Sequence, residues 1–183
     1  MSRGESTVRL ILWIALGTGM TACGGSSEPE TTAASGAIEL AHFPLDAGEV
    51  PRGDAATFDA SVSRDGRGSL RVEASRDGLL RLYDLDDVGF VQGQVVLTGF
   101  LRSRGLDGQA MLEMRCQPRE GDEAFVRGAR GAVAGDAGWT PQEIRFSDPT
   151  LCRDPASIRI NLLIRGSGTV WIDDLRLWSV ASD

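Results

Sequence analysis

The sequence predicts an all-β domain, a sandwich or a barrel, for most of the chain. From Ala37 to the C-terminus, short runs in which apolar and polar residues alternate are separated by clusters of Gly, Asp and Pro. A period of two puts the apolar side chains on one face of a strand, and the clusters supply turns. The pattern gives roughly ten strands at a spacing of about 8–15 residues, and no segment has helical periodicity.

The segments differ in how they should be buried. Residues 69–74 and 158–164 alternate and each predict a strand with one buried face. Residues 94–103 are apolar on both sides, which is typical of a central strand. Residues 104–108 are rich in Gly and polar residues and predict a turn, after which 110–116 forms the next strand.

The last strand contains a change of parity. Val170 and Ile172 point to one face, and Leu175 and Leu177 should line the same core although they have the opposite parity. The slip falls at Asp173–Asp174. One extra residue at this point is what a β-bulge supplies, so the sequence predicts a bulge there.

Two phrases of the sequence resemble a known fold family. GTVWIDDLRL at 168–177 resembles the last strand of galactose-binding-like jelly rolls, and DASVSRDGRGSLRVEA at 59–74 resembles their second and third strands. That family includes carbohydrate-binding modules of the xylanase-associated kind. Residues 97–114 and 139–143 resemble phrases of exported bacterial proteins of uncharacterised function. The resemblance implies a jelly-roll β-sandwich over residues 37–180, a fold that hosts many functions.

The resemblance also implies a structural Ca²⁺. In such jelly rolls the ion joins the first strand, the turn after the second strand and the acidic last strand. By position Asp173 would be the side-chain ligand, with Glu39 or Asp46 as an acid near the start and carbonyls near Asp65 and Gly66. Ca²⁺ takes about six to eight oxygen ligands. The alternative is that Asp173 and its neighbour make turn or backbone hydrogen bonds without a metal.

Residues 1–22 predict a lipoprotein signal peptide. The apolar run Leu10–Leu16 follows two Arg residues and is shorter than the ~20 residues that a membrane-spanning helix needs. Residues 20–24 (MTACG) resemble a bacterial lipobox, in which Cys23 is lipidated and becomes the new N-terminus. We expect this signal segment to be helical. The alternative to a lipoprotein signal is an ordinary signal peptide with a chance cysteine.

Residues 23–36 are small and polar and predict a flexible tether behind the lipid anchor. The resemblance to bacterial lipoproteins, with Gly24 after the cysteine, implies the cell envelope and favours an outer membrane location, facing the periplasm or the cell surface. The chain has a net charge of −7, and all its basic residues are Arg. An acidic protein with scattered Arg is a poor nucleic-acid binder, so the membrane contact should come from the lipid.

Catalysis has little support in the sequence. His42 is the single histidine, so neither a zinc site with a second His nor a nucleophile with its own base can be assembled convincingly. Glu113 and Glu143 could form a glycosidase pair only at a separation that the sequence does not fix. We therefore expect a protein that is not an enzyme.

Cys116 and Cys152 remain after the lipobox cysteine, and export permits a disulfide between them. A bridge would close a loop of about 37 residues and contribute about 3–4 kcal/mol in the chain-entropy model. The alternative is a buried free thiol, because Cys116 shares a strand face with Leu112 and Met114.

A ligand-binding face is predicted on the polar sides of the strands. Arg81 and Tyr83 share one side of their strand, and Glu113 and Arg115 share the polar side of theirs. Trp139, at a strand start after a loop, is the best candidate for an aromatic plate. Such surfaces recognise sugars, because polar groups bind hydroxyls and an aromatic ring stacks on the sugar. The alternative is a solvated sheet face with salt-bridged Arg and Glu.

These observations favour a membrane-anchored lipoprotein that presents a non-catalytic binding module for a carbohydrate or glycan. The alternative is a protein-interaction or structural envelope domain without a small-molecule ligand.

Overall fold

The computed structural model describes residues 36–46, 56–88 and 93–181. Cys23, the predicted signal peptide and all of the tether except Gly36 lie outside the described residues. No helix among the described residues is long and apolar enough to span a membrane. The described elements are β1 (Ala37–Phe43), β2 (Ala56–Asp59), β3 (Ser69–Ala74), β4 (Gly78–Asp86), β5 (Gln94–Pro118), β6 (Ala124–Arg127), η1 (Ala129–Gly131), β7 (Val133–Arg145), η2 (Pro149–Cys152) and β8 (Pro155–Val180).

Two long strands, β5 and β8, organise the domain. They pair antiparallel along almost their whole length, from Gln94 opposite Val180 to Pro118 opposite Pro155. Both strands bend at the same level, where Gly108 lies opposite Gly166 and both have positive φ. A Cβ on Gly166 would lie 1.4 Å from the carbonyl oxygen of Asp107, so only glycine allows this close approach. The turn expected at 104–108 is therefore wrong: it is a bend within one continuous strand.

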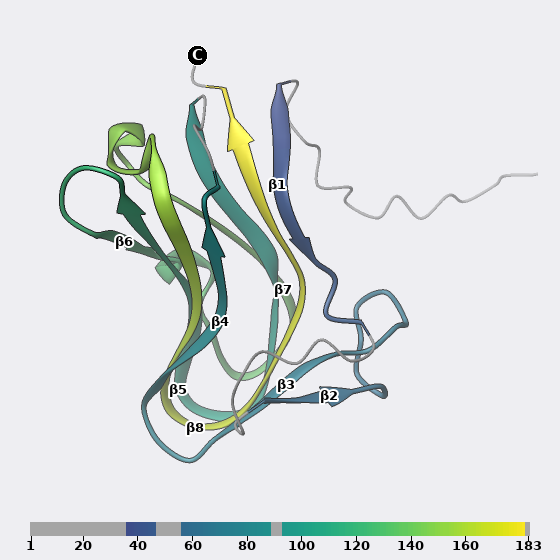
Figure 1. Ribbon diagram of the computed structural model, residues 1–183. Helices are drawn as coiled ribbons and strands as arrows, with labels where there is room; N and C mark the ends of the chain where they lie inside the picture. Colours follow the sequence, from purple (N-terminus) through teal and green to yellow (C-terminus); the bar gives the residue numbers. More distant parts are fainter. Residues whose placement is uncertain (1–35, 47–55, 89–92, 182–183) are drawn as a thin grey trace, which may run out of the picture. The chain divides into compact units, whose positions relative to one another are not determined.

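The bend divides the sheet into two layers (Figure 1). In the first layer, the start of β5 and the end of β8 pair with β7 on one side and with β1 and β3 on the other, and β2 extends β3. In the second layer, the end of β5 and the start of β8 lie between β6 and β4. All pairings are antiparallel, so the all-β sandwich predicted from the sequence is confirmed.

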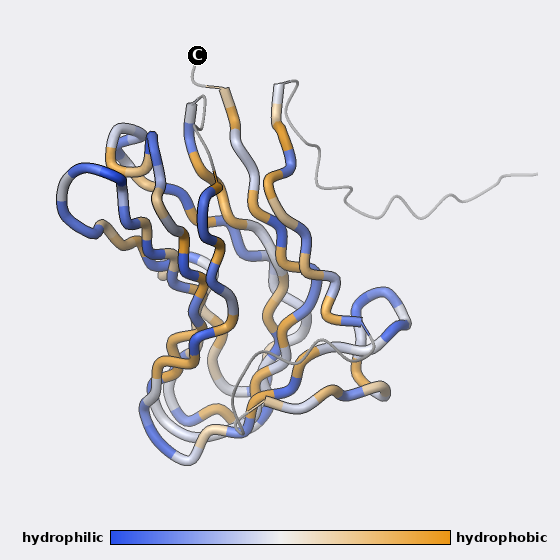
Figure 2. The backbone as a smooth tube through the Cα atoms, viewed as in Figure 1, coloured by the Kyte–Doolittle hydropathy of each residue, from blue (hydrophilic) through white to orange (hydrophobic). Residues whose placement is uncertain are grey.

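The core lies between the two layers. Along β5 and β8 aliphatic core residues alternate with more polar residues. Figure 2 shows the alternation of hydropathy along the chain. Each buried Leu or Ile side chain contributes about 1.5–3 kcal/mol relative to exposure to water. The fully buried large side chains include Leu97, Leu101, Leu112, Met114, Ile158, Ile160, Leu162, Ile172, Leu175 and Leu177.

The bulge predicted in the last strand is present. The register between β8 and β5 shifts so that Asp174 and Leu175 together lie opposite Gly99. Asp174 has φ +48°, the left-handed conformation, which re-aims the chain. Ile172 and Leu175 both point into the core because of the bulge, while Asp173 and Asp174 both lie on the outer side.

A disulfide joins the end of β5 to η2. Cys116 and Cys152 are both buried, with Cα atoms 5.8 Å apart and an S–S distance of 1.99 Å. The bridge spans 36 residues of sequence that include β6 and β7. It therefore fastens the segment that carries β6 to the second layer.

Candidate functional site

The outer face of the second layer carries two rows of side chains that cross four strands. We call this surface the four-strand face. Opposite residues in an antiparallel sheet point to the same side, so the strand registers define both rows. In order from β4 through β8 and β5 to β6, the first row is Arg81, Asn161, Glu113 and Arg127, and the second row is Asp84, Arg159, Arg115 and Phe125.

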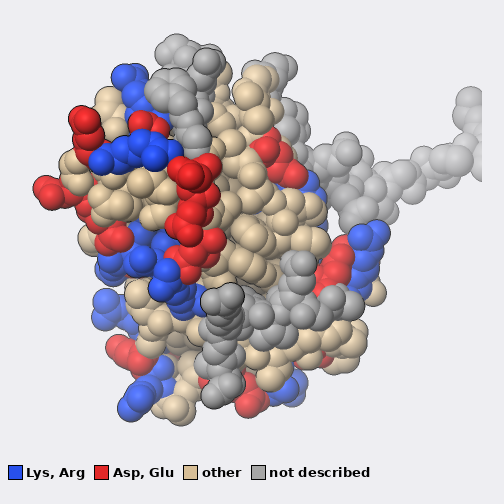
Figure 3. All heavy atoms as spheres, viewed as in Figure 1, with Lys and Arg blue, Asp and Glu red and all other residues tan. Residues whose placement is uncertain are grey.

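Strand alternation explains why these residues lie outside. Leu112 and Met114 of β5 point into the core, so Glu113 between them points outward. Ile158 and Ile160 of β8 do the same for their polar neighbours. In Figure 3 basic and acidic side chains lie interspersed over the left of the view, where Figure 1 places β4 and β6.

Glu113 is the centre of the face and has no exposed surface. It accepts hydrogen bonds from Arg115 Nε (2.8 Å), Arg127 Nε (2.7 Å) and Asn161 Nδ2 (3.1 Å). Burial by itself raises the pKa of a carboxyl, but here the three donors outweigh it and hold the pKa of Glu113 below its usual value. Glu113 is therefore a charged residue that fixes two guanidinium groups in place.

The remaining charges continue this network to the other edge of the layer. Arg115 Nη1 contacts Glu123 at 2.7 Å, and Arg159 reaches the same Glu123 at 3.8 Å and Asp84 at 3.1 Å. Asp84 also pairs with Arg81. Four guanidinium groups and three carboxylates thus form one connected network across the face. Such a network orders its side chains before any ligand arrives.

Phe125 is an aromatic ring exposed on this network. Phe125 is 53% exposed, and the guanidinium carbons of Arg127 and Arg115 lie 5.0 and 5.4 Å from the ring centre. These cation–π contacts hold the ring without covering it. An exposed ring beside fixed polar groups is the combination that a sugar-binding surface needs.

Tyr83 does not belong to this face, and its predicted placement beside Arg81 was wrong. The register of β4 against β8 shifts between Arg81, opposite Asn161, and Tyr83, opposite the core residue Ile160. The extra residue turns Tyr83 inward, where its ring stacks on Phe43 with centroids 3.7 Å apart. The bulge at Leu82 gives no signal in the sequence, because alternation alone puts residues 81 and 83 on one side.

Trp139 was also wrongly grouped with this face. It lies on β7, in the part that pairs with the first-layer half of β5. Its indole N–H donates to the carbonyl of Ser63 at 3.1 Å, so it holds the loop after β2. Of the five predicted ligand residues, the structure brings together Arg81, Glu113 and Arg115.

Five residues of the two rows were missed by sequence reasoning. Arg159 and Asn161 could have been found from the sequence, because they occupy the polar positions of a strand that alternates. Phe125 and Arg127 lie in a four-residue strand too short to stand out, and Asp84 is placed by the bulge in β4. Only the pairing of β6 with β5 brings Phe125 next to Arg115.

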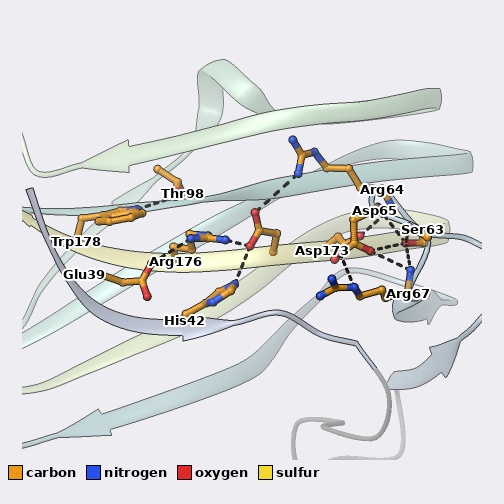
Figure 4. A network of polar contacts seen from close by, with 12 residues as sticks. Glu39, His42, Ser63, Arg64, Asp65, Arg67, Thr98, Asp173, Arg176 and Trp178 are labelled. Atoms are coloured by element: carbon orange, nitrogen blue, oxygen red, sulfur yellow. Dashed lines mark hydrogen bonds and ion pairs between the residues drawn. The ribbon is translucent and has the colours of Figure 1, made fainter. Parts of the chain in front are cut away.

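The first layer carries a second polar site around the β8 bulge. A cavity of about 160 Å³, which we call the acidic cavity, opens beside Asp173. Figure 4 shows the polar contacts among several of its lining residues. Its acids come from the segment after β1, the loop after β2 and β8. The lining residues are His42, Pro44, Asp46, Arg64, Asp65, Arg67, Asp173, Asp174 and Arg176.

The two aspartates of the bulge have different surroundings. Asp174 is paired with His42 (2.8 Å) and Arg176 (2.9 Å). Asp173 is 1% exposed and accepts a hydrogen bond from the backbone N–H of Arg64 (2.9 Å). Burial raises the pKa of Asp173 to about 6, and the negative charges of Asp65 and Asp174 add to this.

Glu39, the predicted partner of Asp173 in a metal site, lies elsewhere. It pairs with Arg176 at 3.2 Å, and its register position opposite Trp178 is several residues along β8 from Asp173. Asp46, the other acid considered, lines the acidic cavity and has a buried Oδ1 without a hydrogen-bond partner. The prediction of Glu39 was wrong because alternation cannot tell which end of β1 reaches the bulge.

The carboxylates of the acidic cavity supply some, but not all, of the oxygen ligands that a hard cation needs. Carboxylate oxygens are Ca²⁺ ligands. Among the described residues, Asp173 has no ion pair, and Asp46 Oδ1 is buried without a hydrogen-bond partner. Arg67 lies 3.6 Å from Asp46 and 3.7 Å from Asp65. Among the residues that the structure describes, no three His, Cys, Asp or Glu side chains are grouped closely enough to surround a metal. Backbone carbonyls would have to complete such a site.

The fold is similar to that of solved carbohydrate-binding modules. The CBM22-1 xylan-binding domain of Xyn10C from Paenibacillus barcinonensis matches 82% of this chain and 100% of its own, with a TM-score of 0.57 and 17% identity. The C-terminal family 22 module of Xyn10B from Clostridium thermocellum matches 79% and 95%, with a TM-score of 0.54 and 13% identity. The domain has their β-sandwich fold. No protein-family model and no curated protein sequence matches the chain.

Proposed function

We propose that this chain is a non-catalytic glycan-binding module and that the four-strand face binds the sugar. The observation that carries the proposal is Phe125, an exposed ring in cation–π contact with Arg115 and Arg127 and near the buried Glu113. A sugar ring stacks on Phe125, and its hydroxyls meet the guanidinium groups and the exposed carboxylates. Because the network already fixes these side chains, little conformational entropy is lost on binding.

The fold likeness supports the same proposal. Two of the similar solved domains are described as xylan-binding. Because their sequence identity to this chain is low, the similarity supports a shared fold, and the binding of a glycan is our proposal. His42, the single histidine in the sequence, is bound to Asp174 and lies in the other layer from Glu113. We assign it a role in holding the bulge and assign no catalytic residue.

A glycan array followed by calorimetry tests the proposal on residues 23–183 without the signal peptide. We expect binding to at least one glycan, weakened at least tenfold, or about 1.4 kcal/mol, by Phe125→Ala. Leu151→Ala is the control, because Leu151 is also exposed but lies in η2. A folded protein that binds no glycan would instead support the alternative, a protein-interaction or structural envelope domain.

We further propose that the module is anchored in the cell envelope through lipidated Cys23. The support is the lipobox at residues 20–24 and the small, polar tether that follows. Incorporation of labelled palmitate into the full chain, abolished by Cys23→Ala, tests the anchor. Cell fractionation then tests whether the protein resides in the outer membrane, and recovery in the soluble fraction would contradict the proposal.

We propose a structural Ca²⁺ in the acidic cavity, with Asp173 and Asp46 as side-chain ligands. The ion would supply the positive charge that the buried Asp173 lacks. A thermal melt in Ca²⁺ and in chelator tests this. We expect a higher midpoint with Ca²⁺ and no difference for Asp173→Asn, whereas an unchanged midpoint of the wild type would count against the ion.

A further inference from the structure

Building on the proposed glycan site, we propose that its ligand is an acidic oligosaccharide whose uronic acid carboxylates bind Arg127 and Arg81. The two rows that define the four-strand face, with Glu123 beside them, hold four Arg against three acids. The chain as a whole has a net charge of −7. Asp86, which lies on the same side of β4 and near Arg81, makes the numbers of acids and Arg residues equal. An anionic ligand is therefore favoured by the unused donors of individual Arg residues rather than by the net charge of the face.

The two outer Arg residues of the first row have donors to offer. Within the described residues, the Arg127 guanidinium hydrogen-bonds to the protein through Nε to Glu113, and Arg81 pairs through Nε with Asp84. Their Nη groups make no such contact in this part of the chain. Arg81 and Arg127 are also the most exposed of the four, with side chains 58% and 39% exposed.

The inner Arg residues are used differently. Arg115 contacts both Glu113 and Glu123, and Arg159 contacts Asp84 and Glu123. Their charges are largely compensated within the network. Arg115 and Arg159 therefore hold the face together, while the two Arg residues at its edges remain able to bind a carboxylate by two parallel hydrogen bonds.

Geometry favours an oligosaccharide over a single sugar. Arg127 and Arg81 stand at opposite ends of a row that crosses four strands, a span of about 14 Å at ~4.8 Å per strand. One carboxylate cannot reach both. Phe125 lies beside Arg127 on β6, so a sugar stacked on the ring presents its carboxylate to Arg127 and a later unit of the same chain reaches Arg81.

Matched pairs of ligands test the inference. Oligomers of glucuronate, galacturonate and mannuronate, each beside its carboxyl-reduced neutral counterpart, are titrated into residues 23–183, together with neutral xylan and galactan oligosaccharides. We expect at least one acidic oligomer to bind at least tenfold more tightly than its reduced form, with an affinity that falls as salt rises. Arg127→Gln and Arg81→Gln should each weaken acidic binding by at least fivefold.

The controls separate this inference from the proposed function. Arg145→Gln removes an exposed Arg that pairs with Glu143 in the first layer and should leave the affinity unchanged. Phe125→Ala should weaken acidic and neutral sugars alike. Binding of neutral oligosaccharides as tight as that of acidic ones would overturn the inference and leave the proposed function in place. Binding to none of the sugars would overturn both.

Discussion

Glu113 and Asp173 are both buried carboxylates on the outer side of a strand, yet their pKa values move in opposite directions. Glu113 receives hydrogen bonds from two guanidinium groups and an amide, which outweigh the cost of burial and lower its pKa. Within the described part of the chain, Asp173 receives hydrogen bonds only from the backbone N–H groups of Arg64 and Asp174, so burial, with the charges of nearby carboxylates, raises its pKa to about 6. The partners, not the depth, decide whether a buried acid stabilises the domain.

The same contrast separates the two layers. The four-strand face is complete within the protein, because every acid in its network has an Arg partner. The acidic cavity is less complete. Among the described residues, Asp173 has no ion pair, and Asp46 Oδ1 is buried without a hydrogen-bond partner although Arg67 lies 3.6 Å from the other oxygen of Asp46. A surface that is already ordered suits the binding of an external ligand, and a cavity with uncompensated charge suits a cation that belongs to the structure.

Breaking the disulfide should have the largest effect, and it should act on the second layer. Replacing Cys116 and Cys152 by Ser removes the covalent link between two residues that are 36 positions apart in the sequence. The loss should lower the free energy of unfolding by about 3–4 kcal/mol. Urea denaturation of the variant and the wild type measures this. A loss below about 1 kcal/mol would show that the pairing of β6 with β5 holds without the bridge.

Glu113→Gln tests the four-strand face, where the buried acid is fully paired. It leaves Arg115 and Arg127 without the acid that they share and should cost about 2–3 kcal/mol at pH 7. Glu143→Gln is the control: its pair with Arg145 is more than half exposed and should cost no more than about 0.5 kcal/mol. Equal effects of the two variants would contradict the importance of burial at Glu113.

Asp173→Asn tests the acidic cavity, where the charge of Asp173 lacks an ion-pair partner among the described residues. A raised folded-state pKa means that the stability of the wild type is greatest below the unfolded pKa, near 4, and falls as pH rises through 6. Asparagine removes this loss, so the variant should gain about 2 kcal/mol relative to wild type between pH 4 and pH 7 in chelator. Urea midpoints across this range measure it. If the difference in stability between the variant and the wild type did not change with pH, the titration would not belong to Asp173.

The smallest effect is expected at the bulge itself. Asp174 has φ +48°, so Asp174→Ala should cost about 1–2 kcal/mol in backbone strain together with its ion pairs. Asp174→Asn tolerates the left-handed conformation and should cost less than Ala by about 1 kcal/mol. If the two variants are equally stable, the loss of stability comes from the ion pairs of Asp174 and not from backbone strain.

The amino-acid sequence by itself determined the fold class, the bulge and three of the eight residues that form the two rows. Alternation of apolar residues is local, and a change of parity between Ile172 and Leu175 can be read directly from the chain. The Asp173–Asp174 pair marked the bulge for the same reason. Glu113 and Arg115 were predicted together because they lie two residues apart on one strand.

Tertiary structure decided everything that depends on register between distant strands. The shift at Leu82 turned Tyr83 toward the core, against which it packs half-buried, and Asp46 rather than Glu39 reached the acidic cavity. Phe125 came to lie beside Arg115 through the pairing of β6 with β5. A one-residue shift reverses the face of every following side chain, and the energy that selects it comes from packing across the whole sheet, which local sequence does not contain.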